Sequence, residues 1–264
     1  MKKDFAIFTI VQNEKYFLPK LIKYYTQYVN PEDFYVLDHD STDGSTDNLN
    51  VNVEKVSYEF SFDHQWLVNT VQTFQKKLLS KYKYVIFVES DDFLYNLEGD
   101  FISTLIDTFK NYNAILNTGY NIIHDYKDSE SSSDFDITND EFMTSCISKR
   151  SYWSRKPNHD KALVVNTPCN YALGFHGFSF ANKSSGFKSI KLPSLFLAHL
   201  HTVDWKINEQ RISHRIKGKK LLENDSGAPH NKSMQEQENH FNFFLKSKEK
   251  IPSNHKLKMI QLGI

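Results

Sequence analysis

The sequence predicts an α/β protein with a mostly parallel central sheet, helices on its faces and further helices near its C-terminal end. Short apolar runs alternate with stretches of helical periodicity through residues 1–115, which is typical of parallel strands joined by crossover helices. One of these runs, at 84–88, is entirely apolar, as expected of a central strand that is covered on both faces.

Each element is predicted from its own pattern. Runs rich in Val, Ile, Phe and Leu that end at polar residues predict strands at 5–11, 34–37, 53–58, 84–88 and 114–117. Apolar residues three and four apart predict helices at 16–28, after the N-cap candidate Asp63, and around 101–109. Farther along we expect strands at 161–165 and 195–199, and helices at 206–217 and 233–245.

Composition excludes several classes of protein. The 264 residues are 39% apolar and 14% aromatic, enough for a sizeable core, so general disorder is excluded. Acids and bases balance at 32 each, and only four of the cations are Arg, so nucleic acid is not an expected partner. Two cysteines favour a reducing compartment, and neither a signal peptide nor a membrane-spanning run is recognised. We therefore expect a cytoplasmic protein.

Zero net charge conceals two segments of opposite sign. Residues 125–141 carry a net charge of −6, and residues 205–222 carry +5. A solvated loop and a solvated helix face are the simplest interpretations. The basic segment could alternatively rest on an anionic membrane as a peripheral contact.

Polar clusters follow three of the predicted strands. Asn13 and Glu14 follow the first, residues 38–44 the second, and residues 89–92 (Glu-Ser-Asp-Asp) the third. Open α/β sheets bind ligands at the carboxyl ends of their strands. Acids at neighbouring strand ends repel one another unless a cation lies between them, so a divalent ion such as Mn²⁺ or Mg²⁺ is expected there.

Two other metal sites fit poorly. A calcium loop starting at Asp38 would need a Gly at its sixth position and Glu at its twelfth, where this chain has Asp43 and Leu49. Zinc could be imagined at Cys146, Cys169 and His159, but their spacing matches no paired zinc-ligand pattern.

Several segments together resemble family-2-like glycosyltransferases with the GT-A fold, which is Rossmann-like. Three of them are similar to the sequential motifs of that family, namely 10–14 (Ile-Val-Gln-Asn-Glu), 36–45 and 88–94. Two more, 174–176 (Gly-Phe-His) and 199–204 (His-Leu-His-Thr-Val-Asp), resemble segments of one bacterial branch. The resemblance runs in order through residues 5–215.

The resemblance implies a role for each matching position. Asp38 would contact the base or ribose of a nucleotide, Asp43 would hold the loop around it, and Asp91 matches the metal-binding acid. Glu89 stands where Asp is usual and is one methylene longer. The whole set implied to bind a nucleotide sugar is Thr9, Asn13, Glu14, Asp38, Asp43, Glu89 and Ser90.

The two histidines of the last segment have a physical argument of their own. Alternate side chains of a strand share a face, so His199 and His201 point the same way and could complete a metal site with Asp91. One structural and one exposed histidine is the alternative. For the proton transfer that glycosyl transfer needs, His176 and Asp160 are the candidate catalytic residues. Candidate contacts to a diphosphate are Arg155, Lys161 and Lys183.

The resemblance thus implies a metal-dependent glycosyltransferase that moves a sugar from a nucleotide donor, most often a UDP-sugar, to a glycan or lipid-linked acceptor in surface polysaccharide synthesis. The catalytic domain would span 1–204, with a nucleotide-sugar half at 1–115, an acceptor half at 116–204 and a helical extension at 205–264. A sugar-phosphate nucleotidyltransferase is an alternative, but it would carry a Gly-rich loop after the first strand. A sugar-binding module without catalysis would not need acids at three strand ends.

Overall fold

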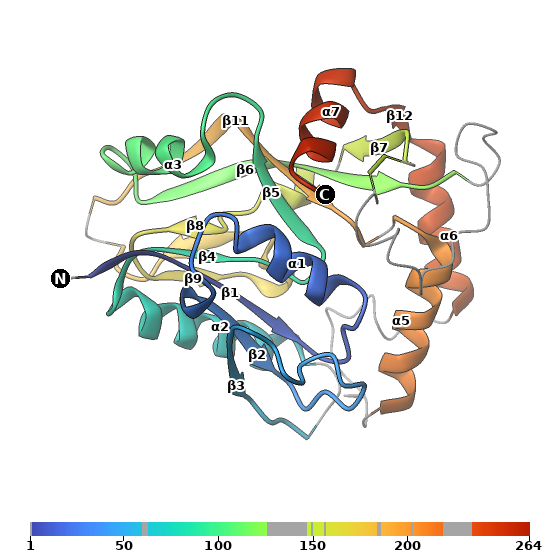
Figure 1. The fold of residues 1–264 in the computed structure, drawn as a ribbon, viewed down its shortest axis with the longest axis horizontal. Coiled ribbons are helices and arrows are strands. Elements are labelled where there is room, and N and C mark those ends of the chain that lie inside the picture. The colour runs from blue at the N-terminus through green and yellow to red at the C-terminus, as the bar shows by residue number, and fades with distance from the viewer. Residues whose placement is uncertain are drawn as a thin grey trace.

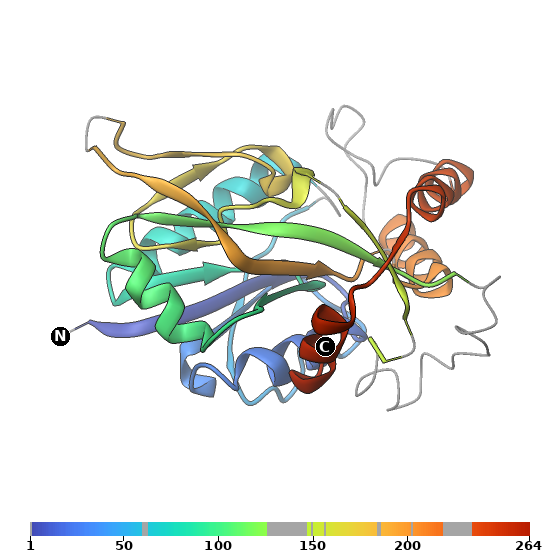
Figure 2. The same ribbon diagram turned by 90° about the horizontal axis from the view of Figure 1, so that it is seen from above.

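The computed structural model describes residues 2–59, 63–125, 147–148, 150–155, 157–183, 186–201, 203–218 and 234–264. A twisted sheet runs through the molecule and helices cover both of its faces (Figure 1). Turned by 90°, the molecule has α2 on one side of the sheet and α1, α3 and α7 on the other, while α5 and α6 stand at one end (Figure 2). The α/β class and the flanking helices that the sequence predicts are confirmed.

The elements have the following bounds. The strands are β1 (Lys3–Val11), β2 (Phe34–Asp38), β3 (Asn52–Lys55), β4 (Tyr82–Phe87), β5 (Asp92–Asn96), β6 (Ala114–Ile123), β7 (Tyr152–Arg155), β8 (Val164–Val165), β9 (Cys169–Tyr171), β10 (Phe178–Phe180), β11 (Ser189–His199) and β12 (Glu249–Lys250). The α-helices are α1 (Phe17–Tyr25), α2 (His64–Leu79), α3 (Phe101–Phe109), α5 (Trp205–Gly218), α6 (Met234–Lys246) and α7 (Ser253–Gln261). Short 3₁₀ turns lie at η1 (Pro31–Asp33), η3 (Pro157–His159) and η4 (Leu173–Phe175).

The main sheet joins a parallel half to a mixed half. Its order is β12-β7-β6-β8-β4-β1-β2-β3, and β11 pairs with both β5 and β6. The strands β4, β1, β2 and β3 are mutually parallel, as is the β6–β11 pair. The strands β5, β7, β8 and β12 pair antiparallel with their neighbours. Buried side chains of β1, β2 and β4 form the middle of the core, with exposed fractions of 0% at Ile7, Val36 and Ile86.

Several elements differ from the sequence prediction for identifiable reasons. The strand expected at 114–117 extends to Ile123, because the polar residues Asn117 and Asn121 that interrupt its apolar run are themselves buried. The sequence does not predict the strand β5, since this strand begins inside the acidic cluster. Nor does it predict the helix α7, which is mostly polar and buries only His255 and Met259.

Helix α1 fixes the position of β5 through two buried tyrosines. Tyr24 donates a hydrogen bond to the carbonyl of Leu94 at 2.5 Å, and Tyr25 donates to the carbonyl of Asp92 at 3.1 Å. The Tyr25 hydroxyl also accepts from the Leu94 amide at 2.9 Å. Burial raises the pKa of both phenols well above the ordinary value, so they stay protonated as donors. The strand that carries Asp92 is thereby held against α1.

The C-terminal residues pack against the same sheet. Strand β12 pairs with β7, the His255 ring meets the Tyr95 hydroxyl at 2.8 Å, and Lys20 donates to the carbonyl of Gly263 at 2.9 Å. The helices predicted after residue 205 are present as α5 and α6. Within the described residues, no helix combines the length and the apolar character that crossing a bilayer requires. Most of the predicted acidic loop (126–141) and the stretch 219–222 lie outside the described residues.

One glycine of β6 makes room for a histidine of the neighbouring turn. A Cβ at Gly119 would lie 2.3 Å from the His159 Cβ and 2.5 Å from the His159 carbonyl oxygen. His159 therefore rests directly on the backbone of β6. At Gly177, by contrast, an added Cβ would meet only Ala172, at an ordinary 3.5 Å.

We predict that Gly119→Ala lowers the free energy of unfolding by about 1–3 kcal/mol, because the methyl group overlaps backbone and Cβ atoms that can move only with η3. Gly177→Ala is the matched control, and its effect is expected to stay within about 0.5 kcal/mol. Urea unfolding followed by circular dichroism measures both. Equal stability of the two variants would contradict the close packing of His159 on β6.

Candidate active site

The polar loops that follow β1, β2 and β4 meet at one edge of the sheet. Because β1 lies between β2 and β4 and is parallel to both, the carboxyl ends of the three strands are adjacent. In Figure 1 these ends point toward α5. Glu14, Asp38 and Asp91, predicted from three separate motifs, therefore lie at the same edge.

The loops after β1 and β2 are tied to each other. Asn13 donates its backbone amide to the Ser41 hydroxyl at 3.0 Å and accepts from the Thr42 amide at 2.7 Å through its side chain. The Glu14 amide donates to the Ser45 hydroxyl at 3.2 Å. Asn13 has a φ of 55°, a left-handed conformation that Asn adopts more readily than most residues. These hydrogen bonds fix the backbone position of Glu14 and hence the position from which its side chain extends.

The acids of the second loop bind donors of the same loop. Asp38 accepts from the Ser41 amide at 2.8 Å and from the Thr46 hydroxyl at 3.1 Å, and only 3% of Asp38 is exposed. Asp43 accepts from the Ser45 amide at 3.0 Å. Both carboxylates therefore shape the loop.

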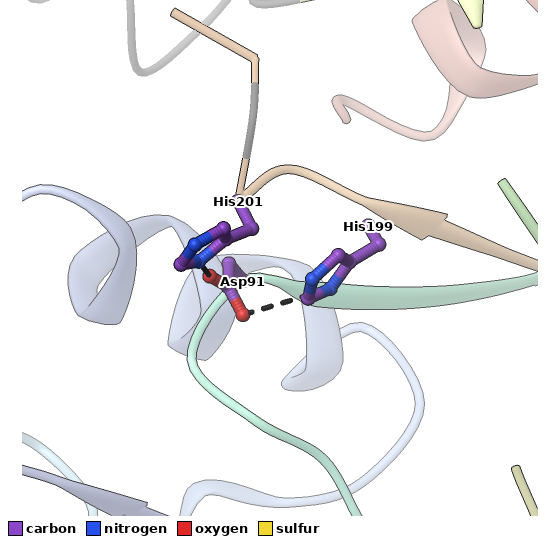
Figure 3. Close-up of side chains that lie close together, drawn as sticks. All are labelled: Asp91, His199 and His201. Carbon is purple, nitrogen blue, oxygen red and sulfur yellow. Dashed lines mark hydrogen bonds and ion pairs between the residues drawn. The ribbon is translucent and has the colours of Figure 1, made fainter. Parts of the chain in front are cut away.

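Asp91, His199 and His201 come together, and Figure 3 shows the two imidazole rings on either side of the carboxylate. The His201 Nδ1 lies 3.3 Å from the Asp91 Oδ2, and the His199 Nδ1 lies 3.7 Å from the Asp91 Oδ1. The potential ligand atoms of all three residues lie within 4.8 Å of one another. A backbone bond from the Leu200 amide to the Asp91 carbonyl, at 2.9 Å, holds the two segments together. This donor set can hold a divalent metal ion.

The protonation states of His201 and Asp91 favour metal binding. Burial lowers the pKa of His201 to about 4 despite its bond to Asp91, so the ring is neutral at neutral pH and keeps a lone pair. Burial disfavours the charge of Asp91, but Arg211 and the two imidazoles outweigh burial and hold its pKa well below the ordinary value.

Asp92 orients one of the two imidazoles. The His199 Nδ1 lies 2.7 Å from the Asp92 Oδ1 in a fully buried pair. Burial disfavours the charged form of Asp92, but the positive charge of Lys161 and the hydrogen bond with His199 together have the larger effect and lower the pKa of Asp92. This carboxylate is therefore an anion that can accept hydrogen bonds but cannot donate them. Nδ1 of His199 therefore carries the proton, and Nε2 remains available as a ligand. Hydrogen bonds of this kind position metal-binding histidines in many proteins.

Two buried cations each bridge a pair of carboxylates. The guanidinium of Arg211, on α5, lies 2.7 Å from Asp91 and 2.6 Å from Glu14. Lys161 contacts Glu89 and lies 3.0 Å from Asp92. The Ser90 hydroxyl adds a bond to Glu14 at 2.8 Å.

The two cations do not neutralise all the carboxylates of the site. The four carboxylates of Glu14, Glu89, Asp91 and Asp92 face the two cations, which leaves these six side chains with a formal charge of −2. Burial disfavours the charge of Lys161, yet its two acids raise its pKa above the ordinary value. The pKa of Arg211 is raised for the same reason, against burial. One divalent cation would neutralise the site.

Arg211 is a site residue that the sequence does not predict. It belongs to the basic segment 205–222, but only 5% of Arg211 is exposed, so one of that segment's six cations is not part of the surface. A signal was available, because Asn208 and Arg211 lie three residues apart on α5, and Asp204, just before the helix, lies four residues before Asn208, so the three can share one side of it. All three are buried.

The two candidate catalytic residues lie in different surroundings. Asp160 accepts bonds from Arg155 at 2.7 Å, Lys191 at 2.6 Å and the Gly119 amide at 3.0 Å. Burial opposes its charge, but these donors lower the pKa of Asp160 below the ordinary value. His176 is exposed, and its Nδ1 meets the Asn158 carbonyl at 2.7 Å.

A row of imidazoles connects His176 to the metal ligands. His176 stacks on His159 with ring centroids 5.7 Å apart, and the rings of His159 and His199 are T-shaped to each other with centroids 4.2 Å apart. The sequence suggests His159 only as a zinc ligand. Of its imagined partners, Cys146 lies outside the described residues, and burial raises the pKa of Cys169 to about 12, so this thiol stays protonated.

Comparisons with known proteins give distant similarities to several solved structures. No family model and no curated protein matches the sequence. Glucosyl-3-phosphoglycerate synthase from Mycobacterium tuberculosis, solved with Mn²⁺, UDP and glucosyl-3-phosphoglycerate, is 18% identical over 44% of each chain, with a TM-score of 0.30. The mannosyltransferase Ktr4p from S. cerevisiae is 16% identical over 49% of this chain and 41% of its own, with a TM-score of 0.27.

A third structure covers more of the chain. Mannose-1-phosphate geranyltransferase from Thermus thermophilus is 7% identical over 87% of this chain and 66% of its own, with a TM-score of 0.27. The chain spans less than half the length of the glucosyl-3-phosphoglycerate synthase and of the mannosyltransferase. None of these sequence identities and TM-scores is high enough to indicate a function.

We predict that Lys161→Met lowers the free energy of unfolding at pH 7 by about 3–5 kcal/mol, because Glu89 and Asp92 lose the cation between them. In the wild type, the lowered pKa of Asp92 contributes stability above the ordinary carboxyl pKa, and this stability is lost as the pH falls. In the variant, burial without a cation raises the pKa of Asp92, so the deficit should shrink between pH 7 and pH 5.

Urea unfolding at the two pH values measures this difference. Lys77→Met is the control, because Lys77 pairs with Glu54 at an exposed position and its loss should cost at most about 1 kcal/mol at either pH. A Lys161→Met deficit that grows as the pH falls would contradict the assigned charges.

Proposed function

We propose that the protein is a metal-dependent glycosyltransferase that transfers a sugar from a nucleotide-diphosphate sugar, with a UDP-sugar as the expected donor, to a glycan or lipid-linked acceptor in surface polysaccharide synthesis. The observation that carries the proposal is the meeting of Asp91, from the loop after β4, with His199 and His201, next to Glu14 of the loop after β1, in a cluster with an uncompensated charge of −2. A divalent ion held there would balance that charge and could also bind a diphosphate.

The donor set favours one kind of metal. One carboxylate and two imidazoles provide mixed oxygen and nitrogen ligands. Mg²⁺ prefers oxygen ligands in a nearly ideal octahedron, whereas imidazole suits transition metals. We therefore propose Mn²⁺ in preference to Mg²⁺. When bound, the ion would polarise the diphosphate and stabilise the charge of the leaving nucleotide.

Buried polar atoms support a nucleotide pocket beside this centre. Within the described part of the chain, the Thr9 hydroxyl and the Glu14 Oε1 are buried without a hydrogen-bond partner. Such atoms are costly unless a ligand or water satisfies them. We propose that Thr9, Asn13 and Glu14 line the pocket and that Asp38 contacts the base or ribose. Asp43 would hold the loop, while Glu89 and Ser90 would lie beside the diphosphate.

The proposed organisation assigns the nucleotide to 1–115 and the acceptor to 116–204, with 205–264 as a C-terminal extension. Arg211 lies in that extension and contacts Glu14 and Asp91, so the extension contributes to the site. A peripheral membrane contact of 205–222 and a cytoplasmic location stay predictions.

For the acceptor proton, the geometry favours His176 over Asp160. Asp160 is bound by two cations and its pKa is lowered, which makes it a weak base. His176 is exposed and adjoins the row of rings that ends at His199. We propose His176 as the base and Asp160 as a residue that positions Arg155 and Lys191.

We predict that calorimetry with UDP-sugars detects binding in the presence of Mn²⁺ and none when the metal is chelated. Asp91→Asn should weaken Mn²⁺ binding by more than the ~10–100-fold that loss of an outer partner costs, because a direct ligand is lost. Asp107→Asn is the control, since Asp107 is an exposed residue of α3 that pairs with Lys110 on the surface. Binding that does not depend on metal, or sugar transfer by Asp91→Asn at the wild-type rate, would contradict the proposal.

We predict that His176→Gln lowers kcat by roughly 10²–10⁴-fold, as expected for loss of a general base. Asp160→Asn should lower it by less than about 10-fold, because Asp160 positions other groups. Initial rates of donor consumption with acceptor present, measured across pH, provide the test. The opposite order of the two variants would transfer the role of base to Asp160.

A further inference from the structure

Arg211 contacts two of the three candidate metal ligands. One guanidinium nitrogen, NH1, lies 2.7 Å from the Asp91 Oδ2 and 3.5 Å from the His201 Nδ1. The Asp91 oxygen that accepts from Arg211 also lies 3.3 Å from His201. A cation bound by Asp91 and His201 would need the space and the lone pairs that the guanidinium uses. Two positive charges in contact also repel strongly in a buried site.

The second guanidinium nitrogen is held by the loop after β1. NH2 lies 2.6 Å from the Glu14 Oε2 and 3.4 Å from the Ser90 hydroxyl. The guanidinium also lies over the Phe17 ring, 4.8 Å from its centroid. Within the described residues, Nε has no hydrogen-bond partner. The acids of the candidate active site are thus the main anchors of this side chain.

The first turn of α5 has separate anchors. Asp204 precedes the helix and lies 3.4 Å from His124 and 3.3 Å from Arg150, all three being buried. Arg211 lies about two turns farther along the helix. Gln210, beside it, accepts from the Tyr16 hydroxyl at 2.5 Å. Arg211 can therefore change partners while the start of α5 stays in place.

We propose that Arg211 is an exchangeable internal cation of this site, a proposal that rests on the metal centre of the proposed function. Without metal, Arg211 neutralises Asp91 and Glu14. When a divalent ion takes Asp91, Arg211 leaves that carboxylate. NH2 keeps its contact with Glu14, but NH1 becomes a buried donor without a partner, which is unfavourable, and the diphosphate of the donor is the anion that NH1 then binds.

The exchange predicts opposite effects of one substitution on two ligands. Arg211→Met removes the competitor of the metal, so Mn²⁺ alone should bind at least about 5-fold more tightly, a typical size for coupling between ligands. It also removes the charge-assisted contact of Arg211 with the diphosphate, so UDP in saturating Mn²⁺ should bind at least about 10-fold more weakly. Arg211→Lys keeps the positive charge, so its affinity for Mn²⁺ should stay close to that of the wild type. It should bind UDP less tightly, because an ammonium lacks the two separate NH₂ donors of the guanidinium.

Titration of Mn²⁺ by electron paramagnetic resonance and of UDP by calorimetry measures the two constants. Lys83→Met is the control for the loss of one positive charge, because Lys83 is exposed and pairs with Asp4 on the surface. Unchanged or weaker Mn²⁺ binding by Arg211→Met, or unchanged UDP binding, would overturn the exchange and leave the proposed function standing. Absence of Mn²⁺ binding from both the wild type and Arg211→Met would overturn both.

A measurement on the wild type covers the case in which Arg211→Met does not fold. Hydrogen exchange of the α5 amides around Arg211 should become faster with Mn²⁺ alone, because the contact with Asp91 is lost. Exchange should slow again when UDP is added. Protection of α5 that does not respond to Mn²⁺, while Mn²⁺ binds, would refute the exchange.

Discussion

The pairing of buried carboxylates with two internal cations is the interaction on which the rest of the site depends. Parallel strands bring Glu14, Glu89 and Asp91 to one edge of the sheet, and burial of Asp91 and its neighbour Asp92 would otherwise drive the protonation of these two aspartates. Arg211 and Lys161 keep acids of this edge ionised. An ionised cluster with a deficit of two positive charges can bind a divalent ion, whereas a protonated one cannot.

This requirement explains why distant parts of the chain contribute to one edge. The acids belong to the first 92 residues, but their cations are supplied by Lys161 and by α5, and the imidazoles by β11 and the residues just after it. The helix α5 must therefore lie across the carboxyl ends of the strands, where Figure 1 shows it. Asp204, anchored by His124 and Arg150, fixes the first turn of α5 and hence the reach of Arg211.

The parts of the molecule that the sequence predicted are those with a local pattern. Apolar runs and helical spacing located most of the strands and helices of the first half. Strand alternation predicted that His199 and His201 share a face, and their rings do stack 5.7 Å apart, although β11 ends at His199 and His201 lies in the turn after it. The contact of Arg211 with Asp91 joins residues 120 positions apart, and that of Lys161 with Asp92 joins residues 69 apart. No local pattern encodes such pairs, so the sequence alone leaves Arg211 on the surface.

The two internal cations have different consequences because they contact different acids. Lys161 pairs with Asp92, which holds the His199 Nδ1 and so orients this imidazole, and the lysine therefore supports the site with or without an ion. Arg211 pairs with Asp91, a candidate ligand itself, and so occupies the position that the ion would take. A single charged cluster can thus contain one permanent and one replaceable counterion. The replaceable one is carried by a helix that adjoins both the nucleotide loop and the metal ligands, which couples occupancy of the metal position to the state of α5.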